Sequence, residues 1–187
     1  KPSSPQSVIR AGMLTIHRTH PDYFAMTLIN YIFGGQPTSR LFKNLRQDKG
    51  YSYGYYSAIE WSQITSALIA GGSVETKVTK ESIIETLKEF KEISSEMPIT
   101  QSELNLAKQG ILKGYASQFE TQDQYIDNLA RIALYDLPLD YYKNYVKGVI
   151  TKAKVATKGN CHKERHWRSL KSWMVILPEI QEKVRKQ

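Results

Sequence analysis

The chain has 187 residues, of which 41% are hydrophobic, and a formal net charge of +8 at pH 7. This length predicts one domain, or one half of a larger two-domain protein, with enough residues for a single core. No apolar run approaches the ~18 residues of a transmembrane helix, and no signal peptide is visible. The single cysteine, Cys161, excludes an internal disulfide framework and a multi-cysteine metal site.

The positive charge is concentrated in the C-terminal part of the chain. Residues 151–187 contain ten Lys or Arg and three acidic residues, which gives this part a net charge of +7. A nucleic-acid-binding domain usually carries its basic groups on a face of the folded domain. We therefore interpret residues 157–187 as a solvated basic tail, and do not favour nucleic acid or an anionic membrane as the partner.

The N-terminal part predicts a linker, a strand and a buried helix. Residues 1–6 have the composition of a linker, as expected for a fragment, and residues 7–17 alternate as a strand does. Apolar residues recur at helical spacing over residues 22–33. Gly34 and Gly35 are expected to end this helix, because glycine is free to take a positive φ.

A short helix and a β-hairpin are predicted next. Thr38 or Ser39 can cap the helix, and Gly50 then releases the chain into a tyrosine-rich strand. Residues 64–74 form the second strand, whose glycines indicate a bulge or the close approach of a neighbouring backbone. The stripe predicted to be buried on the short helix is Leu41, Phe42 and Leu45.

The remainder is predicted to be mostly helical. Residues 76–95 form one helix, and capping boxes begin two more at Thr100 and Thr121. Residues 141–150 continue helically, Thr151 caps a last short helix, and Met174–Leu177 resembles a strand. On the first of these helices, the face predicted to be solvated is Glu85, Lys88, Glu89 and Glu92. We therefore expect an α+β fold, with helices packed on one face of a mostly antiparallel sheet.

Four candidate sites are not favoured. The first is a metal site at His17 and His20, which lie three residues apart at the end of a strand and are therefore expected to point to opposite faces. The run from Cys161 to His166 contains several ligand types but neither the H-E-x-x-H nor the H-x-x-E-H order. No nucleophile motif surrounds Cys161, and the glycine pairs match no phosphate-binding motif.

The pair Arg46 and Tyr53 is the fifth candidate. A guanidinium at the end of a helix and a phenol on the following strand can both donate to one carbonyl oxygen. Composition alone does not select this pair over a surface arginine and a structural tyrosine.

Several ordered motifs carry a family resemblance, which covers roughly residues 7–155. They are Pro21-Asp22-Tyr23, Phe33-Gly34-Gly35, Ser39-Arg40-Leu41-Phe42, Asn44-Leu45-Arg46, Lys49-Gly50, Tyr53, Pro98–Glu103, Leu106-Ala107-Lys108, Leu137–Tyr142 and Val149-Ile150-Thr151. Together they resemble the M16 metallopeptidases, such as insulysin, pitrilysin and the mitochondrial processing peptidase. The chain is similar to the C-terminal, zinc-free half of such an enzyme, an M16/LuxS-like metallohydrolase half.

The resemblance implies a function for the pair. Members of the family close two similar halves around a peptide, and the zinc half carries H-x-x-E-H. Arg46 and Tyr53 match the arginine and tyrosine that the zinc-free half presents to the substrate, where they position and polarise the peptide. By resemblance, this chain binds no metal, is inactive alone, and meets its zinc in a partner M16 domain or subunit.

The resemblance ends after about Ala156, where family members continue into an apolar strand that closes with glycine. We expect a single domain over residues 1–187 that is the substrate-presenting half of an M16 zinc peptidase. The alternative is a catalytically inactive, M16-like structural or assembly subunit. A basic nucleic-acid-binding module is the third hypothesis. The sequence does not determine the oligomeric state or the peptide specificity. For the compartment, the bacterial cytoplasm, the periplasm and the mitochondrial matrix all remain alternatives.

Overall fold

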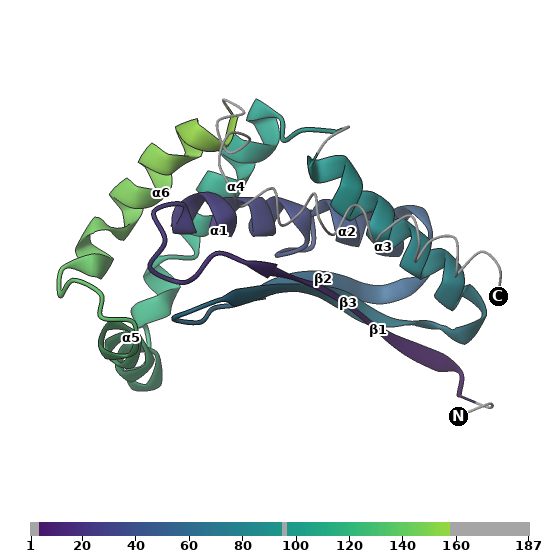
Figure 1. The fold of residues 1–187 in the computed structure, drawn as a ribbon, viewed down its shortest axis with the longest axis horizontal. Helices are drawn as coiled ribbons and strands as arrows, with labels where there is room; N and C mark the ends of the chain where they lie inside the picture. Colours follow the sequence, from purple (N-terminus) through teal and green to yellow (C-terminus); the bar gives the residue numbers. More distant parts are fainter. Residues whose placement is uncertain (1–3, 95–96, 158–187) are drawn as a thin grey trace.

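A computed structural model describes residues 4–94 and 97–157. Within these residues three strands form one antiparallel sheet in the order β1–β3–β2. β1 spans Gln6–Thr15, β2 spans Ser52–Glu60 and β3 spans Ser66–Glu75. β3 is the central strand, with Ala70 opposite both Ala11 on β1 and Ser57 on β2. The predicted α+β fold is confirmed (Figure 1).

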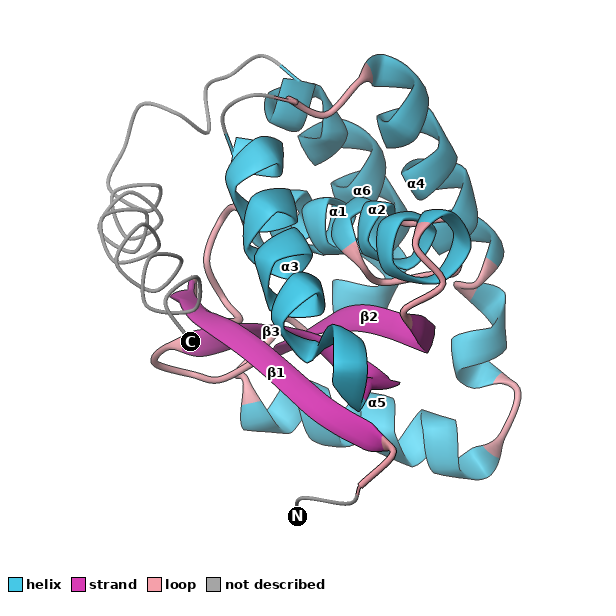
Figure 2. Cartoon of the chain, turned by 90° about the vertical axis from the view of Figure 1, so that its right-hand side faces the viewer, coloured by secondary structure: helices cyan, strands magenta, loops and turns pink. Residues whose placement is uncertain are grey.

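Helices cover one face of this sheet and leave the other open. α1 (Tyr23–Phe33), α2 (Arg40–Phe42), α3 (Thr79–Ser94), α4 (Gln101–Lys113) and α6 (Tyr141–Thr157) lie on one side of the sheet in both ribbon views (Figures 1 and 2). α5 (Gln122–Leu134) lies below the level of the sheet, near the end where β3 begins. The remaining helical turns are a π-helical segment, Lys43–Asp48, and 3₁₀ turns at Thr76–Val78 and Ala116–Phe119.

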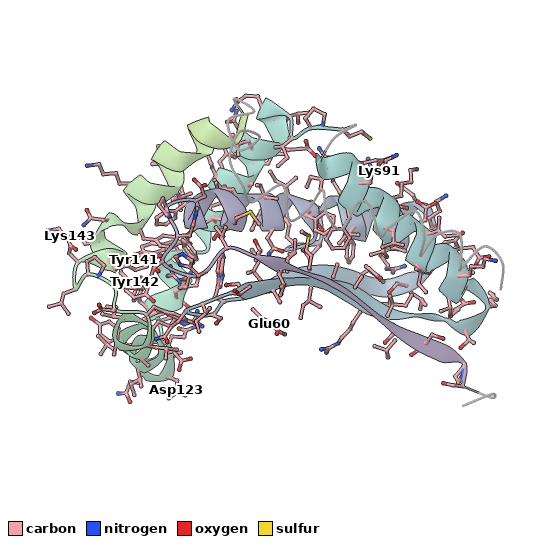
Figure 3. All side chains as sticks on the ribbon, viewed as in Figure 1. Glu60, Lys91, Asp123, Tyr141, Tyr142 and Lys143 are labelled. Atoms are coloured by element: carbon pink, nitrogen blue, oxygen red, sulfur yellow. The ribbon has the colours of Figure 1, made fainter. Side chains whose placement is uncertain are left out.

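The alternation of side chains along each strand produces the two faces. Successive strand residues point to opposite faces, so more buried and more exposed side chains alternate. The buried set on the helix side includes Ile9, Tyr55, Leu68, Ala70 and Val74, which pack with Phe33, Leu41 and Leu45. Val8 and Leu14 on β1 are exposed, as are Tyr53 and Tyr56 on β2. The side chain of Glu60 also points away from the helices (Figure 3).

A second hydrophobic cluster lies between helices. α1, α4 and α6 pack together through residues that include Leu28, Leu104, Ala107 and Val149, all nearly inaccessible to solvent. The apolar spacing along α1 and α4 therefore identifies the buried faces correctly. Both predicted capping boxes are present, at Thr100 with Glu103 and at Thr121 with Gln124. No helix in the described ranges is both long and apolar enough to span a bilayer.

The glycines of β3 behave as predicted. A Cβ atom at Gly71 would lie 2.1 Å from the carbonyl oxygen of Ile9, and one at Gly72 would lie 2.4 Å from that of Gly54. Neither separation is sterically possible. The pairing of β2 with β3 also shifts register between Ser52 and Tyr55, as in a β-bulge. The predicted close approach is thus confirmed, and the extra residue of the bulge lies in β2, shortly before the residue that pairs with Gly72 of β3.

α1 ends at Phe33, so the prediction that Gly34 and Gly35 end this helix is confirmed. The expected positive φ is wrong, because among the described glycines only Gly50 has one, at 66°. Gly34 is needed for space instead, since a Cβ there would lie 2.5 Å from the hydroxyl of Ser57. Thr151 begins no new helix, because α6 continues through it to Thr157 over residues with good helix propensity.

The prediction that Glu89 is solvated is also wrong. Its side chain is buried because α3 packs against the π-helical segment, where the Asn44 amide donates a 2.7 Å hydrogen bond to it. Burial raises the pKa of the Glu89 carboxyl, and the Asn44 hydrogen bond opposes that rise.

The predicted strand Met174–Leu177 and the tail from residue 158 lie outside the described residues. At the other end, the carbonyls of Ser4 and Pro5 accept hydrogen bonds from Thr76.

Candidate functional site

Arg46 and Tyr53 lie next to each other. The guanidinium carbon of Arg46 is 5.1 Å from the centroid of the Tyr53 ring, within the range of a cation–π interaction. Tyr53 is 90% exposed and Arg46 is partly exposed. No ion pair within the described ranges involves Arg46. Both side chains therefore keep donors that can reach a ligand.

The π-helical segment fixes the position of Arg46. The amide of Lys49 donates to the carbonyl of Asn44, five residues earlier, at 3.0 Å. Leu45, fully buried, anchors the segment in the core next to Arg46. Gly50 then turns the chain with its positive φ, and the amide of Tyr51 donates back to Leu45 at 2.9 Å. Short π-helical turns are frequent at functional sites.

The bulge in β2 fixes the position of Tyr53. The buried hydroxyl of Ser52 donates to the carbonyl of Ser73 on β3 at 2.6 Å and accepts from the amide of Gly54 at 3.2 Å. Tyr53 lies within this bulge, on the edge strand of the sheet, and its side chain is exposed. Two residues on, Tyr55 points into the core and is hydrogen-bonded to the Thr86 hydroxyl at 2.8 Å. Burial raises the pKa of Tyr55.

A charged contact that the sequence reasoning missed ties this region to α4. The Arg40 guanidinium donates to both carboxylate oxygens of Glu103, at 2.7 and 2.8 Å, and to the carbonyl of Met97 at 2.6 Å. Glu103 also accepts from the Thr100 amide in its capping box. Partial burial acts to raise the pKa of Glu103, but Arg40 and Thr100 outweigh it and lower that pKa to about 2. The capping box was visible in the sequence, but nothing there paired it with Arg40.

The two histidines of the first candidate lie close together. The prediction that His17 and His20 point to opposite faces is wrong, because the strand ends at Thr15 and a turn brings their ring centroids to 5.5 Å. His17 Nδ1 is hydrogen-bonded to the Thr19 hydroxyl, and His20 Nδ1 accepts from the Asp22 amide. Over residues 4–94 and 97–157 no group of three His, Cys, Asp or Glu is placed to hold a metal ion. The candidate run from Cys161 to His166 lies outside these residues.

Comparison with known proteins assigns the family. The model of the family described as "Peptidase M16 inactive domain" matches residues 1–111. The chain therefore belongs to the M16 inactive-domain family, a family related to zinc proteases, and the resemblance noted in the sequence is confirmed.

Two individual similarities agree with this assignment. The chain is 29% identical over 112 residues to the uncharacterized zinc protease YmxG of Bacillus subtilis, covering 58% of this chain and 26% of that protein. It is 26% identical to the crystal structure of a peptidase M16 inactive domain from Pseudomonas fluorescens, with a TM-score of 0.71, covering 82% of this chain and 37% of that one.

A third similarity shows the fold alone. A chain in complex III2 of Candida albicans matches at 14% identity with a TM-score of 0.69, covering 83% of this chain and 39% of that one. The chain thus spans well under half the length of each of these three relatives.

Proposed function

We propose that this chain is the non-catalytic, substrate-presenting half of an M16-type zinc metallopeptidase. In this proposal Arg46 and Tyr53 bind the backbone of a peptide enclosed between this half and a zinc-bearing M16 domain or subunit. The observation that carries the proposal is the position of the pair, in contact with each other at 5.1 Å, with Tyr53 exposed to solvent on the edge strand β2.

The chemistry of the pair suits a peptide carbonyl. The guanidinium has several N–H donors in a fixed plane, and the phenol adds one O–H donor. Two such donors aimed at one carbonyl oxygen orient the peptide and stabilise negative charge that develops on that oxygen during hydrolysis. The described residues offer no zinc site, so the metal and the H-x-x-E-H motif that holds it are assigned to the partner half.

The test is the peptidase activity of the enzyme assembled from this chain and its zinc-bearing half. Arg46→Ala should lower kcat/KM by roughly 10- to 1000-fold, the range for losing one donor to the reacting oxygen. Lys43→Ala, which removes an exposed positive charge one turn earlier, is the matched control and should leave kcat/KM within about twofold. An Arg46→Ala enzyme with unchanged turnover would remove the role assigned to the pair.

A structural subunit is the second candidate. The similarity of fold to a chain of complex III2 from Candida albicans keeps this candidate in view, because one fold can serve different functions. Purification of the native complex separates the two candidates. A zinc-bearing partner with H-x-x-E-H supports the peptidase, whereas a stable complex without such a partner supports the structural subunit.

A further inference from the structure

A buried arginine lies at the other end of the sheet, away from Tyr53. The backbone amide of Arg18 donates to the carbonyl of Ser62, just beyond the end of β2. From Tyr53 to the last residue of β2 there are seven residue steps, or roughly 23 Å at about 3.3 Å per step. Arg18 is therefore outside the Arg46 and Tyr53 site.

Tyrosine rings pack against the Arg18 side chain. Arg18 is only 5% exposed, and its guanidinium carbon lies 3.7 Å from the ring centroid of Tyr23 and 4.9 Å from that of Tyr141. One guanidinium nitrogen donates to the Tyr141 hydroxyl at 2.8 Å. No ion pair formed by the described residues involves Arg18. Burying a cation without an ion-pair partner is costly, so an anionic ligand in contact with Arg18 would offset part of that cost.

The guanidinium faces a cavity of about 340 Å³. α6 contributes the phenols of Tyr142 and Tyr145 to its wall, and Figure 3 shows Tyr141 and Tyr142 between α6 and α5. α5 contributes Asp127 and Arg131 on the same face of the helix. The apolar residues of α5, including Ile126 and Leu129, are exposed instead. The amphipathic pattern of α5 thus turns its polar side to the cavity.

The charges of the lining match a monoanion. Arg18 and Arg131 supply two positive charges and Asp127 one negative charge, so the lining is +1. A dianionic phosphate would leave the site with a net charge of −1, because no third cation offsets Asp127. A carboxylate, with one negative charge, makes the site neutral. A guanidinium fork also matches the planar geometry of a carboxylate. The volume lies at the small end of ligand pockets, enough for one amino-acid residue and its neighbours' backbone.

We propose that this cavity binds a carboxylate group of a peptide, held by Arg18 and Arg131 and bounded by tyrosine phenols. The carboxylate comes either from the C-terminus of the peptide or from an acidic side chain. This inference does not rest on the role of Arg46 and Tyr53, and it assigns a second peptide contact at the opposite end of the sheet.

Calorimetric titration of the intact protein with three acetylated pentapeptides tests the proposal. The first is penta-alanine with a free C-terminus, the second its C-terminal amide, and the third an amide with one central glutamate. At least one carboxylate peptide should bind roughly 10-fold or more tightly than the neutral amide, as a charge-assisted contact requires. Tighter binding of the first peptide identifies the C-terminal carboxylate as the ligand, and tighter binding of the third identifies an acidic side chain. Equal binding of both shows that the cavity accepts a carboxylate from either source.

Variants locate the binding. Arg131→Gln on exposed α5 should remove most of the carboxylate preference, and Tyr142→Phe should weaken it by a smaller factor. Lys113→Gln removes an exposed positive charge outside the cavity lining and should change nothing. Arg18→Gln, checked for folding by circular dichroism, should abolish the preference. Equal binding of the neutral amide, saturable binding of none of the three peptides, or an unchanged preference in the Arg131→Gln protein would each overturn the proposal.

Discussion

At the scale of single residues, charged side chains serve two different purposes in this chain. Arg40 is paired with Glu103 and joins the short helix α2 to the start of α4. Arg46 and Arg18 have no acidic partner in the described ranges and face solvent or a cavity. The paired arginine is thus structural, whereas Arg46 and Arg18 are available to a ligand.

The Arg40–Glu103 contact should make stability depend on pH. The folded-state pKa of Glu103 is lowered to about 2, below its unfolded value of 4.5. Its contribution is therefore fully present above the unfolded pKa and is lost as pH falls from about 4.5 to about 2. Glu103→Gln keeps one side-chain acceptor for the capping box, and it removes the charge and one of the two oxygens that accept from Arg40.

The expected loss from Glu103→Gln is about 1–2 kcal/mol of unfolding free energy at pH 7, after allowance for solvent screening at this partly exposed pair. Urea titrations at pH 7 and at pH 2.5 measure it, and the difference from the parent protein should shrink at the lower pH. Glu81→Gln, an exposed acid in the first turn of α3, is the control and should cost little at either pH. A cost that is the same at both pH values would contradict the electrostatic account.

At the scale of elements, a π-helical turn, a left-handed glycine and a β-bulge together bring Arg46 to Tyr53. The sequence predicted the short helix and the strand but not the π-helical hydrogen bonding, because no residue pattern distinguishes a π turn from an α turn here. It also assigned the positive φ to the wrong glycines. Gly34 does end α1, as predicted, but only the packing of Ser57 against it shows that a glycine is needed there for space.

Gly50 should be a sensitive position for a purely conformational reason. Its φ is 66°, and no atom lies within 4 Å of a Cβ built there. Gly50→Ala should therefore cost about 1 kcal/mol from backbone strain, with no steric clash. Gly114→Ala is the matched control, because Gly114 has a helical φ of −77° and ordinary contacts. It should be neutral or stabilising by up to about 1 kcal/mol. Equal thermal denaturation midpoints for the two variants would contradict the assignment.

At the scale of the whole molecule, the order of elements followed from hydrophobic periodicity, capping boxes and glycines. The sequence also predicted Arg46 and Tyr53 as a candidate pair, selected by the family resemblance, and the structure brings the two side chains together. It could not reveal the Arg18 cavity, because residues 18, 23, 131 and 141–145 meet only after α5 and α6 fold back beside the sheet (Figure 1). Single-sequence spacing carries no signal for such long-range contacts.

The orientation of α5 is the other feature that periodicity could not give. Its amphipathic pattern correctly predicted a helix, but the pattern alone implies that the apolar side is the buried one. In the structure Ile126 and Leu129 are more than half exposed, and the polar side faces the cavity. Exposed apolar residues grouped in this way are typical of surfaces that another domain covers.

The central claim is that Arg46 and Tyr53 act together on the peptide bond that a zinc-bearing half cleaves. A double-mutant cycle on kcat/KM of the assembled enzyme, with Arg46→Ala, Tyr53→Phe and the combined variant, tests it most directly. We predict that each single substitution lowers kcat/KM, by roughly 10- to 1000-fold for Arg46→Ala, and that the combined loss is clearly smaller than the product of the two. Unchanged kcat/KM in both single variants, or losses that multiply independently, would contradict the account.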